Sequence, residues 1–318
     1  MTSLTAQTAI VVPKFELDLN QVLMSGQTFR WQLDDEGWWI SPVGCDGSIL
    51  RIRRENENLI IEQRNSIRED FVSNYFHLAI SLKKLRDQWA EDGGEDLAEI
   101  IDSMPGIRVV RQDPVECLFS FICSSAAPIH RIRRSVDGMC RGLGRDLGSW
   151  HGTELFAFPK IEDLAKADPG DLSRMGLGFR GRYVIDTARA LLLRGGRDWL
   201  ENLRLVSHGE AKASLVQLPG IGEKVADCVC LFSLDKHHAV PIDVHMARVA
   251  RRQFSDCNAY ESISAKAYLM MSNCFRDRYG EFAGWAQQYF FYGEIESKGL
   301  WDQQLGKHRP KLSSPKPG

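Results

Sequence analysis

A lysine and an aspartate are the residues of this chain best suited to covalent chemistry. Lys224 follows a glycine-rich turn in the stretch LPGIGEKVADC, and Asp243 lies in AVPIDVH. The pattern predicts a helix from Glu223, so the Lys224 cation would oppose the helix dipole in its first turn. That position and partial desolvation favour the free amine that a Schiff-base nucleophile requires. From position alone, however, a solvated surface lysine is the more favoured interpretation.

The aspartate has a structural and a chemical interpretation. Asp243 is predicted to cap a helix over residues 244–252, and such a cap holds a carboxylate rigidly. If the strand-like VPI segment returns it to the lysine, it could stabilise a developing sugar cation and orient the amine. His245, two residues on, fits a phosphate contact and a half-buried helix histidine equally well.

The turn before Lys224 is typical of a helix-hairpin-helix. We predict that one helix ends near Gln217 and that the next runs from Glu223 to about Leu234. Gly220 and Gly222 allow positive φ and bring backbone N–H groups close to a phosphate oxygen at the helix start. Such a hairpin holds a DNA backbone without reading base sequence. An ordinary hairpin between two helices is the alternative.

The last predicted helix, about residues 281–296, has two faces. Gln287, Phe291 and Glu294 lie on the face expected to be less buried. An amide and an aromatic ring there could hydrogen-bond and stack on a planar base, although a peripheral core position for Phe291 is the simpler interpretation. The opposite, core face carries four aromatic residues at helical spacing: Phe282, Trp285, Tyr289 and Tyr292.

The rest of the chain divides into a β-rich and a helical part. Residues 15–64 alternate as a β-meander, a helical pattern follows from residue 66, and the acidic run 91–97 is a boundary. Beyond residue 97 the pattern predicts helices alone, including a central core helix that Asp113 and Pro114 begin. The fold class is α+β, with an N-terminal antiparallel β-sheet domain (1–96), a helical domain (97–300) and a disordered basic tail (301–318).

Composition excludes several classes of protein. The 318 residues are 43% hydrophobic and contain no apolar run near the length that spans a bilayer, so we expect no membrane association. The N-terminus lacks the features of a secretory signal, which predicts an intracellular protein. Eight cysteines without a CxxC pair predict reduced thiols, and neither a metal site nor an iron–sulfur cluster.

Charge is unevenly distributed along the chain. The net charge is −2, which argues against binding nucleic acid through overall basicity. Residues 174–197 nevertheless hold six arginines against one acid, and residues 130–145 hold five arginines against Asp137. These runs, beside aromatic and glycine residues in GLGFRGRY, favour a phosphate-facing surface over a merely solvated one.

Taken together, these segments resemble the helix-hairpin-helix base-excision DNA glycosylases, and most closely the 8-oxoguanine DNA glycosylase/lyase family. LPGIGEKVADC and VPIDVH are accompanied, in the family's order, by SGQTFRW (25–31), RQDPVECLFSFICSS (111–125), GLGFRGRYV (176–184) and GWAQQYFF (284–291). The resemblance covers roughly residues 15–296. It implies a bifunctional enzyme of base excision repair that flips 8-oxoguanine out of double-stranded DNA, releases it and then cuts the strand by β-elimination.

The resemblance also implies roles for individual residues. Lys224 matches the Schiff-base lysine and Asp243 the catalytic aspartate. The carbonyl of Gly26 would accept the N7 proton that 8-oxoguanine has and guanine lacks. The other matches are Cys228 and Phe291 on the two faces of the flipped base, Gln287 at its Watson–Crick edge, Gly220, Gly222 and His245 at phosphates, Arg131 and Arg180 at the opposite cytosine, and Phe179 as a wedge.

The family resemblance further implies that the enzyme needs no cofactor and acts as a monomer, in the nucleus of a eukaryote or the cytoplasm of a bacterium. One segment departs from the family pattern: Ala126-Ala127-Pro128 replaces an asparagine-rich run that contacts the orphaned cytosine. We therefore expect a weaker preference for cytosine, which rests on Arg131 and Arg180. Two alternatives remain at this point, a non-catalytic DNA-damage-binding protein and a related glycosylase with another lesion or opposite-base preference.

Overall fold

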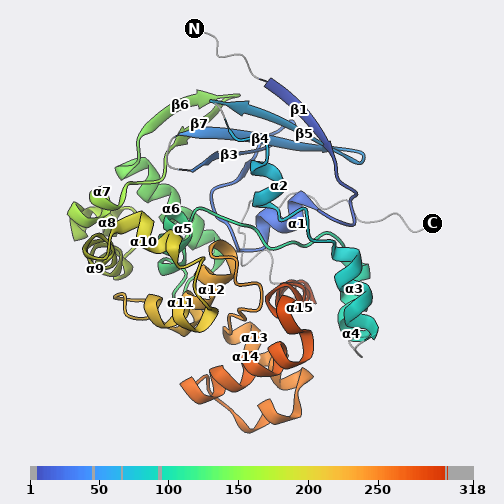
Figure 1. The fold of residues 1–318 in the computed structure, drawn as a ribbon. Helices are drawn as coiled ribbons and strands as arrows, with labels where there is room; N and C mark the ends of the chain where they lie inside the picture. The colour runs from blue at the N-terminus through green and yellow to red at the C-terminus, as the bar shows by residue number, and fades with distance from the viewer. Residues whose placement is uncertain (1–5, 45–46, 66, 92–94, 298, 300–318) are drawn as a thin grey trace.

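An antiparallel sheet at one end of the molecule is joined to a larger body of helices (Figure 1). The computed structural model describes residues 6–44, 47–65, 67–91, 95–297 and 299, so the predicted tail over 301–318 lies outside the described residues. The sheet has the order β1-β5-β4-β3-β2. Its strands are β1 (Ala6–Val11), β2 (Gln32–Leu33), β3 (Trp39–Val43), β4 (Ser48–Glu55) and β5 (Asn58–Arg64).

The predicted meander is confirmed over β2 to β5, but its first part is wrong. Residues 19–24 form helix α1 (Leu19–Met24), because the Asp18 carboxylate caps it by accepting a 3.0 Å hydrogen bond from Gln21 N. Strand β1, which was not predicted, pairs with β5 at the edge of the sheet. One apolar stretch at the N-terminus thus extends the sheet beyond the predicted meander.

The helices before the hairpin of Lys224 lie below the sheet and to both sides of the molecule in Figure 1. The core helix predicted from Asp113 and Pro114 is confirmed as α5, whose residues are buried except for Glu116. Asp113 Oδ1 accepts hydrogen bonds from Val115 N and Glu116 N at 3.0 Å each. In chain order these helices are α2 (Phe71–Tyr75), α3 (Leu82–Glu91), α4 (Glu95–Ser103), α5 (Pro114–Ile122), α6 (Ile129–Leu143), α7 (Ile161–Lys166), α8 (Pro169–Arg174), α9 (Arg180–Leu193) and α10 (Gly196–Asn202).

The later helices build the end of the molecule opposite the sheet (Figure 1). They are α11 (His208–Leu215), α12 (Glu223–Ser233), α13 (Val244–Gln253), the short helix η1 (Ser255–Ala259), α14 (Ala265–Tyr279), η2 (Gly280–Phe282) and α15 (Ala283–Ser297). No helix among the described residues combines the length and the apolar composition that a membrane crossing requires.

A β-hairpin corrects the expectation that the chain beyond residue 97 is helical throughout. Strands β6 (Asp146–Trp150) and β7 (Thr153–Phe156) pair with each other, and Leu155 packs with Ile40 and Ile49 of the N-terminal sheet in a small second core. The segment is short and glycine-containing, so its alternation was too weak to read from the sequence. The hairpin fastens the helical part to the sheet.

Arg108 joins the two parts from inside. Its side chain is 0% exposed, and it donates hydrogen bonds to the carbonyls of Glu16, Phe76, His77 and Ile80. It also pairs with the Glu16 carboxylate at 3.0 Å and lies over a ring of Trp285 in α15. One cation therefore satisfies carbonyls from two separate segments, at residue 16 and over residues 76–80, and the apolar core continues across both parts.

We predict that Arg108→Met lowers the free energy of unfolding by about 3–5 kcal/mol, because it leaves several buried carbonyls without this donor and removes the cation that pairs with the Glu16 carboxylate. Urea unfolding followed by tryptophan fluorescence measures the change. Arg86→Met is the control, since the Arg86–Asp102 pair lies at the surface and its loss should leave the unfolding midpoint almost unchanged. Equal effects of the two changes would contradict a central role for Arg108.

Candidate active site

The predicted helix-hairpin-helix is present as α11, a tight turn and α12. Gly220 has φ +75°, and a Cβ there would lie 2.6 Å from the Tyr183 ring, so both conformation and space require glycine. Gly222 differs from the predicted positive φ, because its φ of −95° is a conformation that any residue can adopt. Nothing lies within 4 Å of where its Cβ would be, and no side chain caps α12. The first N–H groups of α12 are therefore accessible to an anion.

Lys224 is half-buried rather than a freely solvated surface lysine. Its Nζ donates to Ser124 Oγ at 3.2 Å and lies 5.3 Å from the centre of the Phe121 ring. Ser124 Oγ in turn donates to Phe121 O at 2.7 Å. The end of α5 thus holds the amine in place. The sequence reasoning missed Ser124 as an anchor, although it lies in the quoted segment that ends in CSS.

Asp243 caps α13 as predicted. Its Oδ1 accepts hydrogen bonds from His245 N and Met246 N, both at 2.9 Å, so the carboxylate is fixed at the start of the helix. The preceding segment has no assigned secondary structure and belongs to neither of the two described sheets. A hydrogen bond from Ile242 N to the Tyr268 hydroxyl, at 3.3 Å, fixes this segment instead.

Cys228 is close enough to both the lysine and the aspartate to respond to their charges. Burial raises the pKa of its thiol to about 11, while the nearby Lys224 lowers that pKa and the charge of Asp243 raises it. Both groups therefore act on one sulfur atom, which puts the three side chains in one neighbourhood. At neutral pH the thiol is therefore protonated, and it presents a neutral, polarizable surface.

Two residues of α15 lie deeper than predicted. Gln287 and Glu294 are each only 3% exposed, because α15 packs against α4, α13 and α14 and has no wholly polar face. Gln287 Oε1 accepts from Gln288 Nε2 at 2.7 Å, which fixes the amide, and Glu294 pairs with Arg252 at 3.2 Å. The four aromatic residues assigned to the core face do pack into the core.

Phe291 is half-buried, and its ring meets the ring of His245 edge to face at 6.1 Å. The contact brings α15 to the start of α13, where Asp243 lies. A ring at this place is held from one side and keeps part of its surface free for another planar group.

Gly26 lies in a loop that the helical part holds in place. Its φ is +81°, and a Cβ there would come within 2.7 Å of Ile129 Cδ1. The buried Gln27 fixes the loop, since its Nε2 donates to Arg108 O and its Oε1 accepts from Val110 N, both at 2.8 Å. The sequence analysis did not single out Gln27. The feature that could have indicated it is an amide side chain within an otherwise strand-like run.

The residues expected at the opposite strand lie around the turn after α5. Phe179 is 64% exposed, with the Arg180 guanidinium 4.6 Å above its ring centre. Arg180 Nε donates to Ser125 O at 2.8 Å, and Arg131 is exposed. In the same turn Ala126 adopts a φ of +51°, a left-handed conformation that costs an alanine energy.

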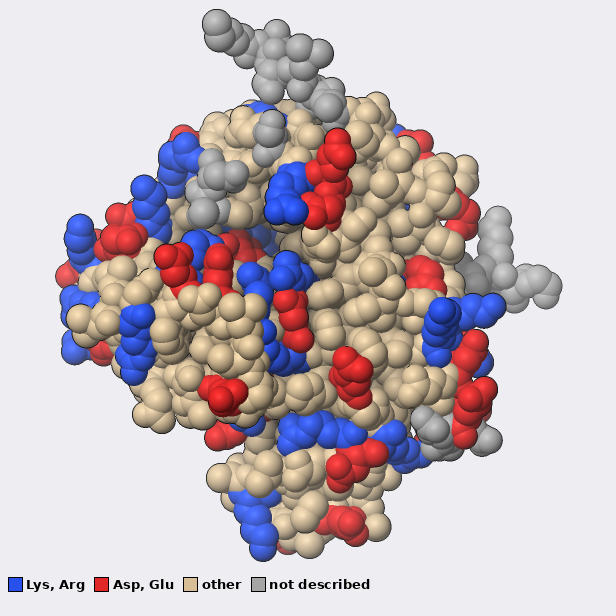
Figure 2. Space-filling model, in the orientation of Figure 1, with Lys and Arg blue, Asp and Glu red and all other residues tan. Residues whose placement is uncertain are grey.

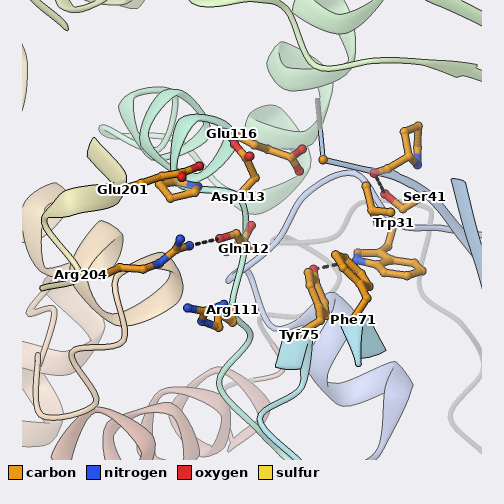
Figure 3. A pocket seen from close by; sticks show the side chains of 14 residues that line it. Trp31, Ser41, Phe71, Tyr75, Arg111, Gln112, Asp113, Glu116, Glu201 and Arg204 are labelled. Carbon is orange, nitrogen blue, oxygen red and sulfur yellow. Dashed lines mark hydrogen bonds between the residues drawn. The ribbon is translucent and has the colours of Figure 1, made fainter. Parts of the chain in front are cut away.

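Cavity size does not locate this site. A cavity of about 190 Å³ is shown in Figure 3, and none of the twelve predicted site residues lines it. Its charged groups serve the fold: Arg111 pairs with Asp235, and Glu116 with Arg30. A larger cavity of about 890 Å³ between the sheet and α6 also excludes the twelve.

Surface charge does not locate the site on the face drawn in Figure 2 either. On the face in Figure 2, Lys and Arg side chains are mixed with Asp and Glu side chains, and no single sign dominates. Among the described residues, no three His, Cys, Asp or Glu side chains lie where they could share a metal ion.

Comparisons with known proteins agree with the geometry. The model of the 8-oxoguanine DNA glycosylase N-terminal domain matches residues 9–118, and that of the HhH-GPD superfamily of base excision DNA repair proteins matches residues 119–268. The N-glycosylase/DNA lyase OGG1 of Arabidopsis thaliana is 34% identical over 93% of this chain and 82% of its own length. The N-glycosylase/DNA lyase of Saccharomyces cerevisiae is 31% identical over 90% and 85%.

A solved structure is similar over its whole length. The 8-oxoguanine glycosylase/lyase of Clostridium acetobutylicum, in complex with double-stranded DNA that has cytosine opposite 8-oxoG, aligns with a TM-score of 0.79. The two chains are 26% identical, and the alignment covers 93% of this chain and 98% of the other.

The fold and the hairpin site define a DNA glycosylase of the HhH-GPD superfamily. Within it, the chain belongs to the 8-oxoguanine DNA glycosylase family of N-glycosylase/DNA lyases. It is a bifunctional enzyme of base excision repair that binds DNA, cleaves the N-glycosidic bond and has lyase activity.

We predict that Ala126→Asn raises the free energy of unfolding by about 1 kcal/mol, because asparagine tolerates the left-handed conformation that alanine adopts there at a cost. Thermal unfolding measures the effect. The control is Ala127→Asn in the same turn, where φ is not positive and the methyl group packs on the core, so stability should fall. A loss of stability in both variants would show that Ala126 is not strained.

Proposed function

We propose that this enzyme excises 8-oxoguanine from double-stranded DNA and that Lys224 is its nucleophile. The observation that carries the proposal is the half-buried Lys224 amine, anchored 3.2 Å from Ser124 Oγ beside Cys228 and within the field of Asp243. A surface lysine needs no such anchor. The names of the relatives and the N-terminal family model support the choice of lesion.

The reaction follows from these groups. The free amine of Lys224 attacks C1′, the C1′–N9 bond breaks, and its electron pair leaves with the base, which takes up a proton. The carboxylate of Asp243 stabilises the positive charge that develops on the sugar. Opening of the sugar gives a Schiff base, and loss of a C2′ proton then expels the 3′ phosphate.

The base pocket distinguishes the lesion from guanine by one proton. The carbonyl of Gly26 accepts the N7–H that only the oxidised base carries, and the Gln27 side chain keeps this carbonyl from moving. Cys228 and Phe291 lie on the two faces of the flipped base. Gln287 meets its Watson–Crick edge, with the amide oriented by Gln288.

The remaining predicted residues hold the DNA. Gly220, Gly222 and the start of α12 contact one phosphate and His245 another, while Phe179 fills the gap in the stack. The last two residues, Arg131 and Arg180, face the opposite base.

We further propose that each predicted domain contributes a different part of the site. Residues 1–96 supply Gly26, and residues 97–300 supply the nucleophile and the DNA contacts. All twelve residues belong to one chain, which supports a monomer as the working unit. Because duplex DNA is the substrate, we place the enzyme in the nucleus of a eukaryote or the cytoplasm of a bacterium.

We predict that Lys224→Gln abolishes the covalent adduct that borohydride traps on an 8-oxoguanine:cytosine duplex. It should also slow base release at least ~100-fold, because the amide has no nucleophilic lone pair. Lys266→Gln, at an exposed position of α14, is the matched control and should trap DNA as the unchanged enzyme does. A full yield of adduct from the Lys224 variant would refute the assignment.

We predict that the unchanged enzyme prefers cytosine only weakly among the four opposite bases, since Ala126 cannot hydrogen-bond to an orphaned base. Ala126→Asn should increase the ratio of single-turnover excision rates for cytosine over adenine by about tenfold, the effect of one or two hydrogen bonds. Arg180→Gln should lower the same ratio. If the ratio is already high and Ala126→Asn leaves it unchanged, the turn does not read the opposite base.

A further inference from the structure

A buried carboxylate lies on the lysine helix, three residues after Lys224. Asp227 is 0% exposed and has three partners from two other helices. His208 Nε2 and Lys212 Nζ of α11 lie 2.7 Å and 2.8 Å from its oxygens, and the Tyr268 hydroxyl of α14 donates to Oδ2 at 2.6 Å. Nothing in the reaction above uses this group.

The carboxylate at the centre of this network is ionised, and its hydrogen bonds are directional. Burial alone would raise the pKa of Asp227, but hydrogen bonds from His208, Lys212 and Tyr268, together with the Lys212 charge, lower it below its ordinary value. Burial raises the pKa of Tyr268 well above its usual range, so the phenol keeps its proton and acts as donor to Asp227. The oxygen of Tyr268 is then free to accept another hydrogen bond.

That second hydrogen bond leads to the catalytic aspartate. Ile242 N donates to the Tyr268 oxygen at 3.3 Å, and Asp243 is the next residue along the chain. A neighbouring group holds the same segment, since Ser272 Oγ donates to Val240 O at 3.1 Å. Two hydrogen bonds through one phenol therefore connect the helix of Lys224 to the residue before Asp243.

A buried ion cluster of this kind is a poor means of gaining stability, because the loss of hydration offsets most of the attraction. Such a cluster is well suited to fixing the orientation of the Tyr268 hydroxyl, since every hydrogen-bond partner has a defined geometry. In this protein the segment over 240–242 belongs to neither described sheet, so no strand pairing fixes it.

We propose that Tyr268, oriented by Asp227, is a positioning residue that sets the Asp243 carboxylate relative to the Lys224 amine. This inference rests on the proposed function, since it assigns the geometry of the same two groups. Displacement of a reacting group by about 1 Å costs up to 100-fold in rate. Loss of the phenol hydroxyl should therefore slow base release and leave DNA affinity unchanged.

The test is a double-mutant cycle with Tyr268→Phe and Asp243→Asn. Phenylalanine keeps the buried ring, and asparagine keeps the helix cap while it removes the carboxylate charge. Single-turnover release of 8-oxoguanine is measured with excess enzyme, with time courses extended to hours for the slow variants. The dissociation constant for uncleaved duplex is measured for each variant, as is the thermal unfolding midpoint.

We expect Tyr268→Phe to slow base release about tenfold in the unchanged enzyme and less than twofold in the Asp243→Asn background, because its effect passes through the carboxylate. DNA affinity should stay within about twofold. Tyr279→Phe makes the same change in the same helix, away from this network. It should leave the rate of base release unaltered in both backgrounds.

Equal slowing by Tyr268→Phe in both backgrounds would overturn the inference, as would no slowing at all. If Tyr268→Phe proves too unstable, Asp227→Asn carries the same test, because it removes the charge that orients the phenol. An unchanged enzyme that releases no base and forms no borohydride adduct would instead refute the proposed function, and the inference with it. An active enzyme with an additive cycle refutes only the inference.

Discussion

The site depends on one unfavourable arrangement, a cation placed at the positive end of a helix. Lys224 lies in the first turn of α12, where the dipole repels it, and the end of α5 holds it there through Ser124 and the Phe121 ring. The position of α5 therefore matters more than its length suggests. Asp113 fixes its start and the core encloses it on nearly every side, so the Ser124 hydroxyl is presented from a rigid base.

The elements that the sequence predicted are those with local signals. Asp113 with Pro114 began α5, the glycine turn separated α11 from α12, and Asp243 capped α13, because caps and turns depend on a few neighbouring residues. The burial of Gln287 and Glu294 has no such signal. It arises because several helices enclose α15, and periodicity within one helix does not report how many neighbours it has.

The same distinction applies within the site. Lys224 and Asp243 could each be singled out by residue type and place, yet the groups that hold them act over long separations. Ser124 lies 100 residues from Lys224, and Gln27 lies 81 residues from the Arg108 carbonyl that fixes the loop of Gly26. Polar residues in such roles look ordinary in sequence, and only the folded chain reveals what they contact.

Two acidic groups on α12, close to Lys224, add no uncompensated negative charge there. A thiolate at Cys228, or an unpaired carboxylate at Asp227, would hold a nearby lysine as an ammonium ion, which has no lone pair for C1′. Burial keeps the Cys228 thiol protonated, and hydrogen bonds from His208, Lys212 and Tyr268 compensate the Asp227 carboxylate. In the proposed reaction, Asp243 is then the carboxylate whose charge acts at the sugar.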